Sequence, residues 1–223
     1  MKFLNRAVCL GCDEPLGRDE QNDDLCFWCR TSLPGWDDSR QDVCPVCGQK
    51  NLSEEGLCCD CRAQNWAFSS MMGLTPYRLG PGHWTAVYKK EPRPRLAKVL
   101  AERFFWDDGP PAILVPVPPH ARHKRQRGWD PVLKLAKVLS KKTGWPLVCA
   151  LRRRPTVSQK SLYRAERFIN AEKSYFLTGE SVKQKVCWLV DDVVTTGATV
   201  QTCAALLKTA GAREVRILCL ALH

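Results

Sequence analysis

Val186-Cys-Trp-Leu-Val-Asp-Asp-Val-Val-Thr-Thr-Gly-Ala-Thr199 is the stretch of this sequence that decides the fold. Its apolar start, Val186 to Val190, has no helical spacing and therefore predicts a buried strand of a parallel sheet. Two adjacent carboxylates, Asp191 and Asp192, end that run. Small and hydroxyl-bearing residues follow, and a helix is expected from Val200 to Ala210. The stretch predicts a strand, a loop and a helix in succession.

The loop from Thr195 to Thr199 has the composition of a phosphate-binding cradle. Gly197 permits a backbone conformation, or a close approach, that a Cβ atom would block. The hydroxyls and inward-turned N–H groups supply donors, and the N-terminus of the expected helix adds a partial positive charge. Asp191 and Asp192 suit another part of the same ligand, because carboxylates at a strand end accept hydrogen bonds from a ribose diol and help to hold hydrated Mg²⁺. The competing interpretation is a helix cap followed by a turn, and the agreement of strand, loop and helix argues against it.

The whole stretch resembles the phosphoribosyl pyrophosphate (PRPP) binding signature of type I phosphoribosyltransferases. The resemblance implies that the two acids contact the ribose and a Mg²⁺ ion, and that Thr195 to Thr199 bind the 5′-phosphate. It makes Asp191 and Asp192 candidate catalytic residues. The PRPP-binding set that we expect comprises Val190, Asp191, Asp192, Val193, Val194, Thr195, Thr196, Gly197, Ala198 and Thr199.

The length and charge of the chain limit the classes of function. A chain of 223 residues allows one medium domain and a small one. Its 34 Lys and Arg against 23 Asp and Glu give a net charge of +11, which suits polyanions such as phosphorylated small molecules or nucleic acid. The sequence carries no cleavable signal and no apolar run of membrane-spanning length, so we expect a cytoplasmic protein without a transmembrane segment.

The cysteines are concentrated in the first part of the chain, where nine of the 13 precede Arg62. In a cytosolic chain this density predicts metal sites rather than disulfides. Paired C-x-x-C knuckles complete the tetrahedral sulfur shell that Zn²⁺ accepts, so we expect two structural zinc ions. The expected ligands are Cys9, Cys12, Cys26 and Cys29 in one site and Cys44, Cys47, Cys58 and Cys61 in the other.

Alternatives to this assignment stay open at the level of sequence. A crossed pairing of the knuckles is compatible with the spacing, and Cys59 can replace Cys58 as a ligand. The ribbons can also grip nucleic acid or a protein partner, although the acidic residues of the first ribbon weigh against phosphate binding. A redox role for the pairs is the remaining rival. The other four cysteines, which we expect to be buried and inert, are Cys149, Cys187, Cys203 and Cys219.

The middle of the chain predicts further parts of the same sheet. The expected elements are strands at Trp66–Tyr77 and Ala112–Pro119 and helices at Pro92–Phe105 and Pro131–Lys141. Lys89 and Lys90 precede the first of these helices. They either face the ligand or form a solvated, basic entry to the helix.

A dense basic run, His120 to Asp130, follows the second of these strands. Because α/β proteins bind ligands at the carboxyl edge of the sheet, we expect these cations to meet the pyrophosphate half of the ligand. The competing interpretation is a basic surface loop. The expected pyrophosphate-binding residues are Arg122, Lys124, Arg125 and Arg127.

The proline-ended strand, the run of arginines and the Arg127-Gly128-Trp129 sequence resemble the competence protein ComF family, also called amidophosphoribosyltransferase-like. Members of that family join an amino-terminal zinc ribbon to a phosphoribosyltransferase domain. The family pattern continues Arg-Gly-Phe-Asn-Gln, whereas Asp130 and Pro131 replace the two amides here, which puts in doubt any contact that those amides make in relatives. The family name implies a part in DNA uptake during natural transformation, with single-stranded DNA and the uptake machinery as partners.

The segment from Arg152 to Asn170 is polar and basic, which is typical of a mobile lid. A lid would bring Arg164 or Arg167 over the leaving pyrophosphate and exclude water, so Arg167 is a third catalytic candidate beside the two acids. A nucleic-acid grip is the rival explanation for these arginines. We expect a short strand at Leu147–Ala150 before this segment and a final strand at Glu214–Leu222.

These patterns predict an α/β fold with a type I phosphoribosyltransferase-like, mainly parallel sheet, helices on both faces and a small amino-terminal zinc-ribbon domain. We expect residues 1–65 to form a double zinc ribbon and residues 66–223 to form the transferase domain. The expected function is to bind PRPP and to transfer or handle its phosphoribosyl group, in connection with DNA uptake. The alternative is a non-catalytic, PRPP-responsive protein that binds single-stranded nucleic acid. The sequence carries no signature for an acceptor base.

Overall fold

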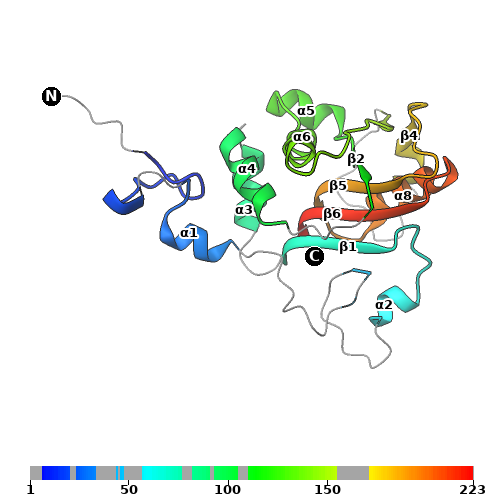
Figure 1. Ribbon diagram of the computed structural model, residues 1–223, viewed down its shortest axis with the longest axis horizontal. Helices are drawn as coiled ribbons and strands as arrows, with labels where there is room; N and C mark the ends of the chain where they lie inside the picture. Colours follow the sequence, from blue (N-terminus) through cyan, green and yellow to red (C-terminus); the bar gives the residue numbers. More distant parts are fainter. Residues whose placement is uncertain are drawn as a thin grey trace.

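A four-stranded parallel sheet forms the centre of the computed structural model, with the strand order β1-β6-β5-β2 (Figure 1). The strands are β1 (Ser70–Pro76), β2 (Ala112–Pro116), β5 (Val186–Val194) and β6 (Glu214–Leu222). The structure describes residues 7–20, 24–33, 44, 46–47, 57–76, 82–90, 93–104, 110–154 and 171–222. β5 and β6 lie between the other two strands and are almost continuously buried, as expected for central strands covered on both faces.

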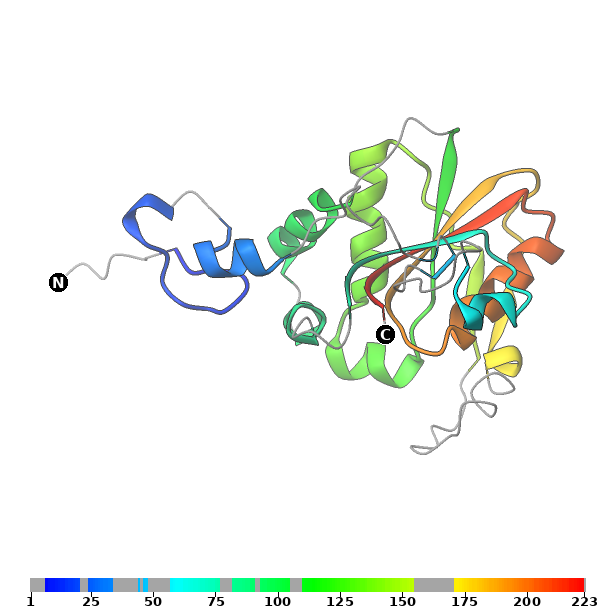
Figure 2. The same ribbon diagram turned by 90° about the horizontal axis from the view of Figure 1, so that it is seen from below.

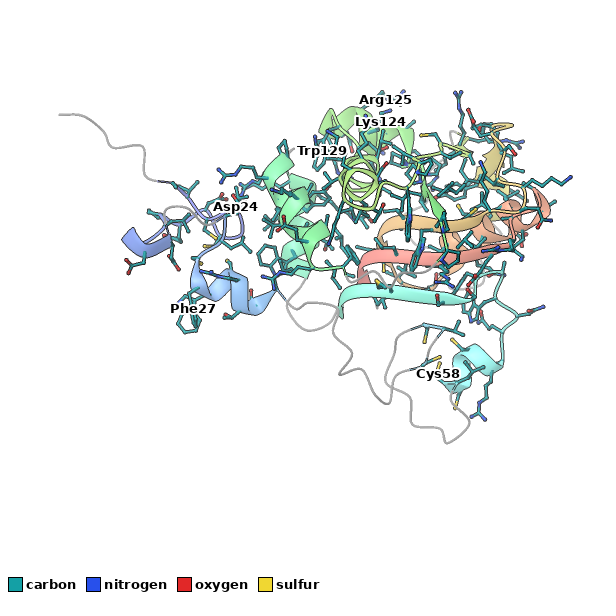
Figure 3. All side chains as sticks on the ribbon, in the orientation of Figure 1. Asp24, Phe27, Cys58, Lys124, Arg125 and Trp129 are labelled. Carbon is teal, nitrogen blue, oxygen red and sulfur yellow. The ribbon has the colours of Figure 1, made fainter. Side chains whose placement is uncertain are left out.

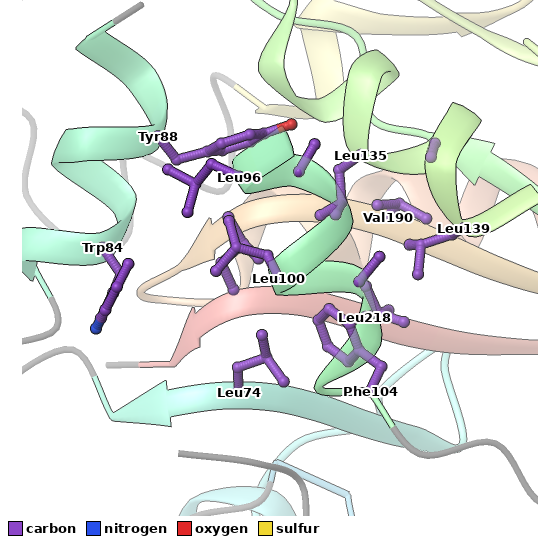
Figure 4. Packing of buried hydrophobic residues seen from close by; sticks show 14 of the residues in the cluster. Leu74, Trp84, Tyr88, Leu96, Leu100, Phe104, Leu135, Leu139, Val190 and Leu218 are labelled. Carbon is purple, nitrogen blue, oxygen red and sulfur yellow. The ribbon is translucent and has the colours of Figure 1, made fainter. Parts of the chain in front are cut away.

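Three helices cover one face of the sheet: α3 (Gly82–Lys90), α4 (Pro94–Glu102) and α6 (Pro131–Thr143). Their apolar side chains form one core cluster with Leu114, Val190 and Leu218 of the strands (Figure 4). Asp130 caps α6, because its Oδ1 accepts a hydrogen bond of 3.0 Å from the N–H of Leu133. This packing fixes the direction in which the chain leaves β2 and enters α6.

The opposite face of the sheet carries α8 (Ala198–Thr209) and a small antiparallel pair, β3 (Leu151–Arg153) and β4 (Tyr175–Leu177). Cys203 and Leu207 of α8 pack against Leu189 and Ile217 in a second core cluster. Helices therefore cover both faces, and the predicted fold class is confirmed.

The amino-terminal part contains η1 (Arg18–Glu20), α1 (Phe27–Ser32) and α2 (Cys59–Arg62). Figures 1 and 2 place η1 and α1 at one end of the molecule, beyond α3 and α4, and α2 elsewhere, near β1. The segment before β1 thus meets the rest of the chain in two separate places. Among the described residues, no helix is both long and apolar enough to cross a membrane.

Several predicted elements have different bounds in the structure. β1 begins at Ser70 rather than Trp66, and the helix expected at Pro92–Phe105 is α4. The strand expected at Leu147–Ala150 is wrong, because Leu147 makes only an isolated bridge to Leu114 and β3 starts after it. The predicted strand Glu214–Leu222 is confirmed as β6.

Three further predictions differ in ways that affect the site. The basic run after β2 is a helix, α5 (Ala121–Arg127), instead of a loop. β5 continues to Val194, so Asp191 and Asp192 lie within the strand. Cys149 is exposed, whereas Cys187, Cys203 and Cys219 are buried as expected.

Candidate functional site

The two adjacent carboxylates lie near the carboxyl end of β5 and interact with residues on opposite faces of the sheet. Side chains alternate along a strand, so Asp191 shares the α8 side with Leu189, and Asp192 shares the α3 and α6 side with Val190. The N–H of Asp192 donates a hydrogen bond of 2.8 Å to Oδ1 of Asp191. The two acids are therefore hydrogen-bonded to each other, although their side chains lie on opposite faces of the sheet.

Asp192 is paired with a lysine from α3. Lys89 Nζ lies 2.9 Å from Asp192 Oδ2, and the two side chains are 26% and 18% exposed. α3 is held in place by Tyr88, which is fully buried and donates a hydrogen bond of 2.9 Å to the carbonyl of Pro131 at the start of α6. Of the two lysines singled out in the sequence, Lys89 reaches the acids, and Lys90 is exposed.

Asp191 is buried, with 8% of its surface exposed. Burial is the largest cause that raises its pKa, to about 8, and the charge of Asp192 adds to the effect. The N–H of Asp192 and the cations of Lys89 and Arg153 act in the opposite direction. Burial thus favours the protonated form of this carboxyl group over the charged form in the free protein.

The loop after β5 leads directly into α8. Gly197 has φ +78°, in the left-handed region, and as the N-cap it brings no side chain to the first amides of the helix. The hydroxyl of Thr196 accepts from the N–H of Ala198 at 3.5 Å. Asp191 and residues 193–200 line a small hollow of about 40 Å³ here. Hydroxyls, main-chain donors and a helix N-terminus meet in this hollow, which is the chemistry that binds a phosphate group.

The basic helix α5 lies at the same edge of the sheet. β2 and β5 are parallel neighbours, with Pro116 opposite Val190, so the segments that follow both strands leave from that edge. Arg122, Lys124 and Arg125 are exposed and Arg127 is half-buried; Figure 3 marks Lys124 and Arg125 on α5.

Charges on and beside α5 relate it to the acids of β5. Burial is the largest cause of the shift at Asp130 and raises its pKa. The charge of Lys124 acts in the opposite direction, and the charge of Asp192 adds to the increase. Burial, followed by the charge of Arg127, lowers the pKa of His123. Lys124 of α5 and Asp192 of β5 therefore both act on the carboxyl group of Asp130.

β3 and β4 contribute two residues that the sequence did not single out for the site. The guanidinium carbon of Arg153 lies 5.1 Å from the ring centroid of Tyr175, and its charge acts on Asp191. The Nε atom of Arg153 is buried without a hydrogen-bond partner. Arg153 was part of the expected lid, and no local pattern distinguished it from its neighbours. The remainder of that lid, including Arg164 and Arg167, lies outside the described residues.

The cysteines form two groups, each with four sulfur atoms that all lie within 4.8 Å of one another. The members are Cys9, Cys12, Cys26 and Cys29 in the first group and Cys44, Cys47, Cys58 and Cys61 in the second. The grouping follows the sequential assignment and not the crossed one. Cys59 is exposed and stands outside the second group. Four thiols at this separation fit a tetrahedral metal shell, so both groups can bind a structural metal ion.

A comparison with protein families finds a match to the second part of the chain. Residues 131–223 match the family model described as the phosphoribosyl transferase domain. The matched part includes α6, the acidic pair, the loop and α8, whereas β2 and α5 precede it.

Two curated relatives are similar over most of their length. Competence protein ComFC of Bacillus subtilis (strain 168) is 24% identical, over 93% of this chain and 91% of that protein. Competence protein ComFC of Streptococcus pneumoniae (strain ATCC BAA-255 / R6) is 25% identical, over 88% of this chain and 87% of that protein. Together with the domain match and the cysteine groups, they confirm the predicted resemblance to the ComF family.

Solved structures with partial similarity were also found. The allosteric regulatory enzyme of purine biosynthesis is 22% identical, with a TM-score of 0.40, over 60% of this chain and 26% of that chain. Adenine phosphoribosyltransferase from Leishmania tarentolae is 15% identical, with a TM-score of 0.39, over 62% of this chain and 75% of that chain.

Proposed function

We propose that this protein binds PRPP, or a closely related phosphoribosyl ligand, at the carboxyl edge of its sheet. The observation that carries the proposal is the acidic pair of β5, in which Asp191 is buried and Asp192 is partly exposed, leading through a hydroxyl-rich loop into the N-terminus of α8. A ligand that bears both a diol and a phosphate matches this order of groups. The phosphoribosyl transferase domain match supports the same ligand class.

In the proposed binding mode, Thr195 to Thr199 hold the 5′-phosphate, and Asp191 and Asp192 hold the ribose diol. The expected pyrophosphate-binding residues of α5 would neutralise the charge at the other end of the ligand. Carboxylates are the hard donors that Mg²⁺ prefers, so the acidic pair can help to hold the ion; when bound, Mg²⁺ stabilises the negative charge of the leaving pyrophosphate. Transfer then depends on positioning and on electrostatic stabilisation by these residues.

The pairing of Lys89 with Asp192 adds a function for α3. The ammonium group holds the carboxylate in one orientation and neutralises it in the free protein. A diol that donates hydrogen bonds to Asp192 would meet a preoriented acceptor. Lys89 is therefore a positioning residue in this proposal.

The two cysteine groups bind structural zinc in this proposal. Zn²⁺ accepts four thiolates in tetrahedral geometry, and closed Cys₄ sites are structural because they leave no open position for a substrate. The division into a ribbon domain (1–65) and a transferase domain (66–223), like the cytoplasmic location, stays a prediction from the sequence.

A second candidate function is the binding of single-stranded nucleic acid without turnover. The exposed cations of α5 and the net charge of +11 favour it, and the names of the two curated relatives are consistent with a part in DNA uptake. Pyrophosphate release from PRPP with candidate acceptor bases would support the enzyme. Salt-dependent binding of single strands with no release of pyrophosphate would support the binding protein instead.

The PRPP site is tested by calorimetric titration of the Asp191→Asn/Asp192→Asn double variant. We expect PRPP affinity to fall by at least about 100-fold, because two charge-assisted hydrogen bonds worth about 1.5–3 kcal/mol each are lost. Glu102→Gln on α4 removes an exposed acid outside the site and is the matched control. Unchanged PRPP affinity in the double variant would refute the proposed site.

A further inference from the structure

The segment between α2 and β1 runs across the start of α8, where Gln201 holds its backbone. The N–H of Ala67 donates to Gln201 Oε1 at 2.8 Å, and Gln201 Nε2 donates to the carbonyl of Asn65 at 3.2 Å. One amide side chain thus fixes the backbone on both sides of Trp66. These bonds join residues 134 and 136 positions apart, so local chain geometry does not impose them.

Trp66 lies directly against the phosphate loop. A Cβ atom at Gly197 would lie 2.9 and 3.0 Å from two carbons of its indole ring, so the ring or the loop would have to shift to accept it. The N–H of Gln201 donates to the carbonyl of Gly197 at 2.8 Å, so the clamp and the loop share one helical turn. The indole therefore packs on the residue whose left-handed conformation turns the loop into α8.

Packing holds the indole in place. The Trp66 and Phe68 rings have centroids 5.0 Å apart, and Phe68 is buried in the cluster on the α8 side. Trp66 Nε1 is buried with no hydrogen-bond partner. A ring that retains a buried, unpaired donor is kept there by its shape and contacts, since a polar bond does not fix it.

The second cysteine group lies immediately before this clamp. Cys58 is the N-cap of α2, and Cys61, which is 5% exposed, lies within the helix. Val46, between the other two cysteines of the group, packs against the same core cluster as Trp66. A short segment therefore connects the second group to the phosphate loop, and in it Trp66 and Phe68 pack against the core.

We propose that the second cysteine group positions the phosphate loop, with Trp66 as the wedge against Gly197 and Gln201 as the clamp. Neither residue is assigned a contact with the ligand. Both lower the entropy that the loop loses when an anion binds, so their loss weakens binding without removing any donor. The identity of the anion rests on the proposed function, whereas the positioning of the loop does not.

Amide hydrogen exchange of residues 195–201 in the ligand-free protein tests the positioning directly. We expect Trp66→Ala and Gln201→Ala to speed exchange in this segment by about tenfold or more, with metal content unchanged. Trp28→Ala, which removes an indole that is 77% exposed, is the control and should leave the segment unchanged. Unchanged exchange in both clamp variants would overturn the proposal. Gln201→Ala covers the case in which Trp66→Ala fails to fold.

The link to the metal group is tested with one ligand variant from each group. Cys58→Ser should speed exchange in residues 195–201, and Cys12→Ser should not. Equal effects of the two variants would overturn a link specific to the second group. In parallel, PRPP affinity should fall about tenfold in Gln201→Ala, equivalent to about 1.4 kcal/mol. Faster exchange combined with no PRPP binding by the wild type would refute the proposed ligand and retain the positioning role.

Discussion

The two cysteine groups have the same ligand set but are attached to the rest of the chain in different ways. The first group belongs to the core cluster of the sheet: Cys9 and Cys29 are buried in one cluster with Trp84 and Leu96 of α3 and α4. The second group reaches the sheet through Val46, a short segment and one glutamine side chain. Two similar cysteine groups are therefore attached to the chain in two different ways.

Polar contacts reinforce the attachment of the first group. Arg93 Nη1 donates to the carbonyl of Leu10 at 2.9 Å, and its Nη2 lies 2.7 Å from Asp13 Oδ1. Arg95 Nη2 lies 2.5 Å from Asp24 Oδ1. These contacts hold the group on α4, beside the helix that carries Lys89.

Each group is connected by packing to a different part of the candidate site. The first packs with α3, whose Lys89 pairs with Asp192. The second leads to Trp66, which packs on Gly197. Loss of the first group is expected to destabilise the core on the α3 and α4 side, and loss of the second is expected to affect mainly the loop.

The largest expected difference is between Cys29→Ser and Cys61→Ser, two equally buried ligands. Each should reduce the zinc content from about two ions per chain to about one. Cys29→Ser should destabilise the chain by roughly 3 kcal/mol, or about 6–12 °C in Tm, because the core cluster is shared; Cys61→Ser should cost less than half of this. Elemental analysis and thermal unfolding measure both quantities. Cys59→Ser should change neither, and equal losses of stability for the two ligand variants would contradict the comparison.

Gly197→Ala should lower the free energy of unfolding by about 2–3 kcal/mol. The left-handed backbone is strained with a side chain, and the new methyl group meets Trp66. Gly128→Ala is the matched control: its φ is +72° and nothing lies within 4 Å of the new atom, so only the strain, about 1 kcal/mol, remains. Denaturant unfolding gives the difference. Equal costs at both glycines would show that Trp66 does not press on the loop.

The raised pKa of Asp191 should make the stability of the fold depend on pH. The pKa of Asp191 is raised to about 8, so the native state holds this proton at pH values where the unfolded chain has lost it. Its contribution to stability is full below the ordinary value of 3.8 and is lost progressively as the pH rises toward about 8. One pKa unit corresponds to about 1.4 kcal/mol, and Asp191→Asn should flatten the pH profile by at least that amount between pH 5 and 8. If the dependence of stability on pH were unchanged in Asp191→Asn and flattened in Asp192→Asn, Asp191 would not be the group responsible for it.

The smallest expected effect concerns the ion pair on the first-group side. Lys89→Met should lower stability by about 0.5–1 kcal/mol, since the pair is partly exposed. Lys98→Met, which removes a pair at 3.9 Å between two exposed side chains, should have no measurable effect. A double-mutant cycle of Lys89→Met with Asp192→Asn measures the coupling. A coupling energy near zero would show that the ion pair between Lys89 and Asp192 does not stabilise the fold.

Sequence patterns predicted the parts of the structure that depend on neighbouring residues. The apolar run of β5, the loop glycine and the helix after it follow from local periodicity and backbone chemistry. The spacing of the cysteines predicted both groups. The roles given to the acids, to α5 and to Arg167 stay predictions, because a ligand site also depends on the ligand.

The missed contacts all join distant parts of the chain. Trp66 was expected to start β1, and only the fold brings it against Gly197. Lys89 pairs with Asp192 because α3 packs beside α6, an arrangement that no local period encodes. Arg153 was placed in a lid because its neighbours are basic, whereas its strand depends on pairing with β4.

The bond between Ala67 and Gln201 also has a consequence for synthesis on the ribosome. Its partners are 134 residues apart, so Trp66 cannot pack against Gly197 until the intervening chain has been made. At ~5–20 residues per second this interval lasts roughly 7–27 s. The second cysteine group is complete before that interval begins, yet the loop against which Trp66 packs does not exist until residues 195–201 have been made. A truncated chain that stops before α8 would therefore carry both cysteine groups and no cradle for a phosphate.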